Sequence, residues 1–332
     1  MLNLAPVENR PMRRTKRAAT AIFLLPFFLL GCGTGDNATE ADERPLVAVS
    51  IFPLGDLVQH IVGDAAHVQV LLPQGASPAT FDVSPRQIVD LGDAFLFVMV
   101  GAGLDEWIGP LSEAAGSTAR VLRVSDGIPL LSGEEEAGEE GAEEAGEHGH
   151  AHEHQTGAGN PHIWLDPVLV RESILPRLEE ALGEAFPAQA SGIRERTRLL
   201  SDSLSALDGE IRAALDPLER RAFIATHSAW TYYAARYGLE EAGVVHAHPG
   251  YEPSSREIAH LLGVAREHGI TCIFTEPQLG ETAVRAIATE LDLPTCLLDP
   301  LGGPEMDGRS GYFEILRFNT RQLVDGLGGS AG

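Results

Sequence analysis

The sequence predicts an α/β protein with two parallel-sheet lobes that are joined by a long, rigid backbone helix. Three observations support this fold class. Short apolar runs rich in β-forming residues recur in two sets of four, segments with helical periodicity separate most of these runs, and a long amphipathic segment lies between the two sets. Strands that alternate with helices favour parallel sheets covered by helices, and two such sets indicate two lobes.

The predicted strands are short in both lobes. The first lobe has predicted strands at residues 46–51, 68–72, 95–98 and 121–124. The second lobe has them at residues 222–225, 243–245, 271–274 and 295–298. Between these runs, the apolar spacing predicts helices over residues 84–91, 254–268 and 282–291.

A long helix is predicted between the two sets of strands, over residues 188–215. Its apolar residues follow the spacing of one helical face, and they are Leu200, Leu204, Leu207, Ile211 and Leu215. At 1.5 Å per residue this helix would be a rod of about 40 Å. Pro187 separates it from an earlier amphipathic segment, residues 169–182, because proline fits a helix start and not a helix interior. So stiff a connection implies a largely preformed ligand site between the lobes.

The chain of 332 residues is long enough for two ordinary domains with buried cores. We expect an N-terminal lobe at residues 46–186, the linking helix at residues 187–217 and a C-terminal lobe at residues 218–328. We expect the protein to be a monomer.

The N-terminus has the pattern of an export signal. A basic start between Arg13 and Arg17 precedes a short apolar stretch at residues 18–30. That stretch is too short to span a bilayer comfortably, since a spanning helix needs about 20 apolar residues. We therefore interpret residues 1–31 as a signal peptide.

The apolar stretch ends in Leu29-Leu30-Gly31-Cys32, which resembles the lipobox of bacterial lipoproteins. In such signals the peptide is cleaved before the cysteine, which then carries lipid. We expect Cys32 to be the lipid attachment site and residues 32–45 to form a flexible, polar tether. The exported protein would be anchored on the outer side of the cytoplasmic membrane or lie in the periplasm. The alternative is an ordinary signal peptide with an incidental cysteine.

Two cysteines remain, Cys272 and Cys296. An oxidising compartment outside the cytoplasm allows them to pair. Both lie in apolar, strand-like runs, so two buried free thiols are an equally open alternative.

The net charge of -24 excludes some partners. Nucleic acid and anionic membrane surfaces call for a basic patch, whereas an acidic protein attracts cations. Much of the charge lies between Glu134 and Glu147, so it says little about the rest of the folded surface.

The acidic run belongs to a segment without an apolar face, residues 133–159, which we expect to be a disordered surface loop. The loop also carries four histidines at alternate positions: His148, His150, His152 and His154. Imidazole is a common metal ligand, and weak sites in series raise the local ion concentration near a stronger site. We expect an auxiliary, metal-collecting role, and a plain solvated linker is the alternative.

Two histidines and two carboxylates lie where the predicted lobes would face each other. His162 follows Pro161 just before a helix start at Asp166, which suits an N-cap with proline at the next position. His227, Glu276 and Asp299 each come at the end of a predicted strand, where ligands of open α/β sheets gather. Imidazoles and carboxylates suit zinc, and also manganese or iron. We therefore expect a divalent metal site in the cleft between the lobes.

These motifs resemble a known family, the zinc and manganese solute-binding proteins of ABC transporters that are built around a rigid backbone helix. The resemblance covers about residues 46–327. It rests on Pro161-His162-Ile163-Trp164-Leu165-Asp166-Pro167, on Thr226-His227 followed by aromatic residues and Tyr237-Gly238, on Glu276-Pro277-Gln278, and on Asp299-Pro300-Leu301-Gly302.

The resemblance implies a function and a ligand set. The protein would capture a divalent ion, zinc before manganese, and hand it to the membrane permease of an ABC importer. His162, His227 and Asp299 would be ligands, and Glu276 would lie close to the site. The acidic, His-rich loop is typical of the zinc branch, and manganese-transporting relatives often carry glutamate in place of His227.

One position departs from the family pattern. The first family ligand is a histidine in a Gly-x-x-Pro-His loop after the second strand, and here Ala79 follows Gly75-Ala76-Ser77-Pro78. Alanine cannot coordinate a metal. A different first ligand, a three-ligand site completed by water, and an altered metal preference are all open. Histidines of the loop at residues 133–159 are the first candidate donors, and His246 and His248 are the next.

Two other functions compete with the carrier. An open coordination position is typical of catalytic zinc, and Glu276 could act as a general base in a hydrolase. However, the sequence has no HExxH signature, so we expect no enzymatic activity. The second alternative is a surface adhesin, because some relatives have been described in that way.

Overall fold

A computed structural model describes residues 44–84, 87, 91–92, 94–132, 159–246 and 252–328. The predicted signal peptide, Cys32, nearly all of the tether, the four loop histidines and His248 lie outside these residues. The predicted helix at residues 84–91 lies mostly outside them as well. None of the helices within the described ranges combines the length and the apolar composition needed to cross a membrane.

Two four-stranded parallel sheets form the framework, as predicted. The first has the order β2-β1-β3-β4, and its strands are β1 (Leu46–Val49), β2 (His67–Val70), β3 (Ala94–Met99) and β4 (Arg120–Arg123). The second has the order β6-β5-β7-β8, and its strands are β5 (Ala222–Ala225), β6 (Glu240–Val244), β7 (Ile273–Thr275) and β8 (Thr295–Leu297). All eight predicted strands are confirmed, with ends that move by a few residues at most.

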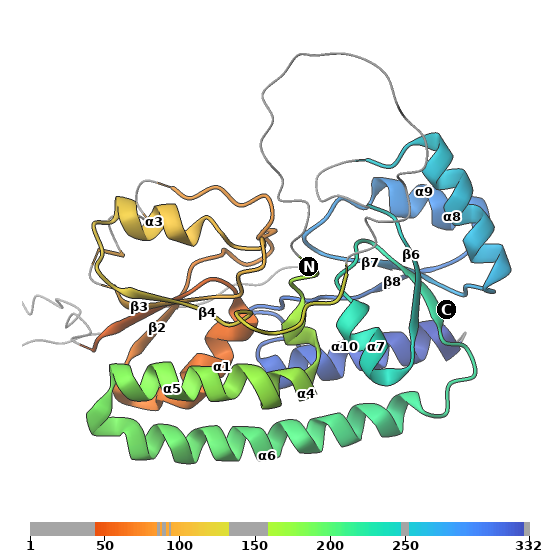
Figure 1. The fold of residues 1–332 in the computed structure, drawn as a ribbon. Helices are drawn as coiled ribbons and strands as arrows, with labels where there is room; N and C mark the ends of the chain where they lie inside the picture. Colours follow the sequence, from red (N-terminus) through yellow and green to blue (C-terminus); the bar gives the residue numbers. More distant parts are fainter. Residues whose placement is uncertain are drawn as a thin grey trace, which may run out of the picture. The chain divides into compact units, whose positions relative to one another are not determined.

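Helices cover both faces of each sheet (Figure 1). One continuous apolar core joins the near faces of the two sheets to a shared layer of helices, which contains α1 (Phe52–Val62), α5 (Leu175–Ala185), α6 (Ala190–Leu215), α7 (Thr231–Tyr237) and α10 (Tyr312–Gly328). Two smaller cores lie on the far faces, one under α3 (Ile108–Ala114) and one under α8 (Ser255–Glu267) and α9 (Thr282–Leu291). Each sheet is therefore the middle of three layers.

The long helix α6 has 26 residues and begins directly after a 3-10 turn, Pro187–Gln189. It packs against α5 and α1 on the side of the first sheet and against α10 on the side of the second (Figure 1). Its buried stripe contains every apolar residue that the sequence placed on one face, together with Ile193 and Thr197. The rigid connection between the two sheets is confirmed.

Asp166 is the helix cap that the sequence predicts. Its carboxylate accepts hydrogen bonds from the backbone N–H groups of Val168 and Leu169, which open α4 (Pro167–Leu169). The same carboxylate forms an ion pair with Arg236 of α7, with a shortest separation of 2.8 Å. A π-helical turn, Val170–Ile174, leads from α4 to α5. The segment after His162 is therefore fixed to α7.

Cys272 and Cys296 form a disulfide, which resolves the open alternative. Cys272 lies just before β7 and Cys296 lies within β8, and Phe274 pairs with Cys296 in the parallel ladder. The bond therefore ties together the two strands that precede Glu276 and Asp299.

Replacing both cysteines by alanine should lower the free energy of unfolding by about 3 kcal/mol, because the disulfide closes a loop with a sequence separation of 24 residues. Urea unfolding of the wild type with and without a reductant provides the measurement, and the double variant is the control that reductant should not affect. Equal unfolding midpoints for all of these samples would contradict the prediction.

Candidate metal centre

His162 begins a 3-10 turn, Ile163–Leu165, and Asn160 fixes its ring. The Asn160 carboxamide oxygen accepts both the backbone N–H of His162, at 3.0 Å, and the Nδ1 of its ring, at 2.9 Å. Because the backbone N–H can only donate, the side-chain atom at this position must be the oxygen. The His162 Nδ1 therefore carries the proton, and Nε2 keeps its lone pair.

Asn160 is itself held by the turn that follows β5. Its Nδ2 donates to the carbonyl oxygen of Ser228 at 2.6 Å and to Oγ1 of Thr231 at 3.1 Å. The Tyr232 hydroxyl donates to the Asn160 carbonyl oxygen at 2.8 Å. The loop that bears His162 is therefore attached to the segment that bears His227.

His227 lies two residues after β5 and is oriented by Glu276. Its Nδ1 lies 3.0 Å from Oε1 of Glu276, which follows β7 and is 2% exposed. A carboxylate on one imidazole nitrogen fixes the tautomer and makes the other nitrogen the better ligand. The Nε2 of His227 is therefore the nitrogen of this ring that could act as a metal ligand.

The two Nε2 atoms face each other at 3.2 Å. When both rings are neutral, both other ring nitrogens donate to oxygens, so two lone pairs point into the same small space. Zinc–nitrogen distances of about 2.0–2.1 Å at a tetrahedral angle place two ligand nitrogens about 3.3 Å apart. The observed separation fits one edge of a zinc tetrahedron, and a cation there would relieve the repulsion between the lone pairs.

The two imidazoles differ in their affinity for protons. Burial, and then the neighbouring His227, hold the pKa of His162 well below its usual value. Burial also disfavours the charged form of His227, but Glu276 and the more distant Glu241 outweigh it, so the pKa of His227 is raised. Of the two rings, His227 therefore takes up a proton more readily than His162.

Asp299 follows β8 and is fully buried. Its Oδ1 accepts hydrogen bonds from Gln278 Nε2 at 2.8 Å and from the backbone N–H groups of Leu301 and Gly302. Among the described residues, its Oδ2 accepts one hydrogen bond, from Nη1 of Arg309 at 2.8 Å, within an ion pair. One carboxylate oxygen is thus held by three donors and the other by one arginine.

Two links join Asp299 to the histidine pair. Glu276 contacts His227 and Gln278, two residues later, contacts Asp299. The Trp164 indole N–H donates to the carbonyl oxygen of Pro300, and the same indole lies against the ring of His162 with centroids 5.1 Å apart. Within the described ranges, however, no cluster of three or more His, Cys, Asp or Glu side chains is assembled around one point. Asp299 is paired with Arg309 in this structure.

Two acceptor atoms beside this group favour a cation. Oε2 of Glu276 and Oε1 of Gln278 are buried and have no hydrogen-bond partner among the residues that the structure describes. Buried acceptors without donors are costly, and a nearby cation lowers that cost. The donor set of two imidazoles and carboxylates is the one that zinc takes in proteins. The residues therefore fit a divalent cation.

Ala79 and His246 are the two remaining positions of interest that the structure describes. Ala79 is exposed in the loop after β2, and the carbonyl oxygen of the preceding Pro78 accepts a hydrogen bond from Trp107. Gln74 of the same loop lies against Gly303, where an added Cβ would lie 2.6 Å from the glutamine side chain. His246 follows β6, is buried, and donates its backbone N–H to the carbonyl oxygen of Thr226, next to His227.

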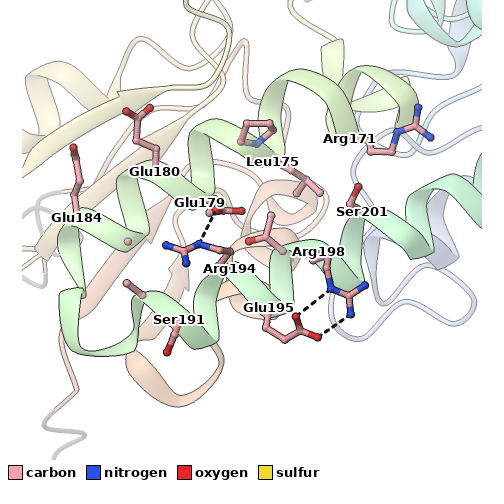
Figure 2. A pocket seen from close by; sticks show the side chains of 14 residues that line it. Arg171, Leu175, Glu179, Glu180, Glu184, Ser191, Arg194, Glu195, Arg198 and Ser201 are labelled. Carbon is pink, nitrogen blue, oxygen red and sulfur yellow. Dashed lines mark hydrogen bonds and ion pairs between the residues drawn. The ribbon is translucent and has the colours of Figure 1, made fainter.

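A surface hollow between α5 and α6 lies among charged residues, four of which form two ion pairs with one another (Figure 2). Glu179 faces Arg194 at 3.8 Å, and Glu195 contacts Arg198 at 2.8 Å. Its lining includes none of the predicted ligands. These charges are those of a solvated helix pair and not of a metal centre.

Three residues that position the site were not predicted: Asn160, Gln278 and Arg309. Asn160 stands two residues before His162 and Gln278 two residues after Glu276, so proximity to a predicted ligand was a usable signal for both. Arg309 lies ten residues after Asp299, and nothing in the sequence marks it.

Comparison with known proteins gives consistent matches over most of the chain. Residues 47–326 match the model of the family described as "Zinc-uptake complex component A periplasmic". The high-affinity zinc uptake system protein ZnuA of Bacillus subtilis is 29% identical over 92% of this chain and 95% of its own. The zinc-binding lipoprotein AdcA of Streptococcus pneumoniae serotype 4 is 25% identical over 90% of this chain, which spans only 58% of that longer protein. A crystal structure of a zinc-bound ZnuA deletion mutant superposes with a TM-score of 0.71 at 26% identity, and the match covers 86% of this chain and 98% of that one.

Proposed function

The chain belongs to the family of the periplasmic component A of the zinc-uptake complex, and we propose that it captures zinc outside the cytoplasm and delivers it to the permease of an ABC importer. The observation that carries this proposal is the pair of Nε2 atoms at 3.2 Å, each with a lone pair and each oriented by a side-chain oxygen on the opposite ring nitrogen. Capture and release of an ion require no chemical step, so we propose no enzymatic activity.

We assign His162, His227 and Asp299 as the protein ligands, and water or a further side chain as the fourth. Glu276 acts through His227, because its carboxylate lies on Nδ1 and not on the nitrogen that faces His162. Histidine accepts either manganese or zinc, and the two-imidazole edge described above has the dimensions of a zinc site. Zinc is therefore the proposed cargo.

The outer parts of the chain complete the proposal. Lipid on Cys32 would anchor the protein through the polar tether, and the four histidines of the loop at residues 133–159 would collect metal near the cleft. The division into lobes at residues 46–186 and 218–328, and the monomeric state, remain predictions.

The delivery function is tested by complementation in a bacterium that lacks its own zinc-binding component. Expression of the wild-type chain together with its cognate permease and ATPase should restore accumulation of radioactive zinc at limiting concentrations. The chain without its permease is the control. Restored accumulation without the permease, or none with it, would contradict delivery to an importer.

Zinc affinity should fall as the pH decreases through the raised pKa of His227, so the loss begins above the usual histidine value of about 6.5. Below that pKa one proton must leave for each zinc bound, which costs about tenfold in affinity per pH unit. His162 adds no second proton until far lower pH, because its pKa is depressed. Competition with a chelator between pH 8 and pH 5 measures the slope.

Glu276→Gln provides the matched control for this pH dependence. Without the carboxylate, burial lowers the pKa of His227, and the onset of the affinity loss should move to lower pH. An onset that Glu276→Gln does not move, or a two-proton slope just below neutral pH, would contradict the assignment of His227 as the titrating ligand.

A further inference from the structure

The two oxygens of Asp299 have different environments. Oδ1 accepts hydrogen bonds from the side chain of Gln278, which follows β7, and from two backbone N–H groups of the turn that follows Asp299. The backbone of Asp299 is fixed as well, since Asn319 exchanges hydrogen bonds of 2.7 Å with both its N–H and its carbonyl oxygen. The carboxylate is thus preorganised, and Oδ2 is the oxygen whose contact can exchange.

Arg309 is the single partner of Oδ2 among the described residues. Its backbone is held in a compact loop, because Gly303 donates to the Arg309 carbonyl oxygen at 3.1 Å and Arg309 donates to the Met306 carbonyl oxygen at 3.0 Å. Gly302, with φ of +61°, leaves no room for a Cβ beside that carbonyl. Only the side chain of Arg309 can therefore move without rearranging the loop.

The Arg309 guanidinium is incompletely satisfied where it lies. Its Nη1 contacts Asp299, whereas its Nε is buried and has no hydrogen-bond partner within the described part of the chain. The guanidinium also lies over the ring of Phe318, 4.8 Å from the centroid, and this cation–π contact does not depend on Asp299. A permanent structural pair would be expected to use more of the five N–H donors.

We propose that Arg309 is an exchangeable counter-cation, which occupies Oδ2 of Asp299 in the metal-free protein and leaves that oxygen when the divalent cation binds. This inference rests on the proposed zinc-carrier function. Asp299 then faces a cation in either state, and the buried carboxylate is never left unpaired. Zinc must displace the arginine to bind, so Arg309 lowers the net affinity and eases release of the ion.

The test compares zinc affinity and thermal unfolding for Arg309→Gln with the wild type. Removing the competing cation should tighten zinc binding by at least about tenfold in a chelator competition at neutral pH. The unfolding midpoint should fall for the metal-free variant, whose Asp299 has lost its partner, and the zinc-saturated midpoint should remain close to that of the wild type. Arg309→Lys returns a cation to Asp299 and should recover most of the wild-type affinity.

Arg317→Gln is the control, because Arg317 of α10 forms an ion pair of 2.7 Å with Glu210 of α6, on helices and not at the strand ends that bear the proposed ligands. It should change both midpoints equally and leave zinc affinity unchanged. If Arg309→Gln behaves in the same way, or binds zinc more weakly than the wild type, Arg309 does not exchange and the inference fails while the carrier function stands. Absence of zinc binding by the wild type would instead overturn the proposed function together with this inference.

Discussion

His162→Ala and His227→Ala should each weaken zinc binding by about two to three decades. Structural zinc sites in small peptides are worth about 10–16 kcal/mol, so one of four ligands contributes crudely 2.5–4 kcal/mol, at about 1.4 kcal/mol per tenfold. The two rings face each other through Nε2, and the loss of either removes one edge of the proposed tetrahedron. Chelator competition on purified protein measures the zinc affinity of both variants.

His60→Ala is the control for these two variants. His60 is exposed on α1, and its ring contacts Asp56 of the same helix. Its removal should leave zinc affinity unchanged. Equal losses from all three alanine variants, or no loss from any, would show that the site lies elsewhere.

Ala79→His should tighten zinc binding by up to two to three decades if water occupies the fourth position, by the same estimate of about 2.5–4 kcal/mol per ligand. Ala79 is exposed in a loop that reaches the second sheet through Gln74 and Gly303, next to the turn after Asp299. A histidine there would restore the family pattern. The measurement is again the zinc dissociation constant.

Deleting residues 133–159 separates the two sources of a fourth ligand. If a loop histidine fills the position, the deletion should weaken the cleft site, and Ala79→His should leave the full-length chain nearly unchanged. If water fills it, the deletion should leave the cleft site intact. A histidine from a disordered loop would recover only part of the energy of a ligand, because ordering the loop costs entropy.

The sequence predicted the fold well because the signals were local and repeated. Each strand is a short apolar run bounded by polar residues, and the α6 stripe from Leu200 to Leu215 has the period of a helix that is buried on one side. The helix cap at Asp166 was also predictable, because an aspartate followed by proline is typical of an N-cap and the first helical position. Some strand ends differ from the predicted ones, because hydrogen bonding to the neighbouring strand, and not composition, decides where a strand begins. For example, β6 begins at Glu240, where it pairs with Ala222 of β5.

The site was predictable only in part. His162, His227, Glu276 and Asp299 could be named because three of them end strands and one precedes a helix cap. Their partners could not. Two contacts join segments that only the folded chain brings together. They are the ion pair of Arg309 with Asp299 and the hydrogen bond from Asn160 to the carbonyl oxygen of Ser228. Composition also left the pairing of Cys272 and Cys296 open, which the adjacency of β7 and β8 decides.

The central claim is that one zinc ion binds between His162 and His227. Anomalous diffraction at the zinc absorption edge, from crystals of the zinc-loaded protein, tests it most directly. We expect one strong peak about 2.0–2.1 Å from both Nε2 atoms, with an oxygen of Asp299 as a further ligand. A peak at any other position in the folded lobes, with the two Nε2 atoms still facing each other unbridged, would contradict it.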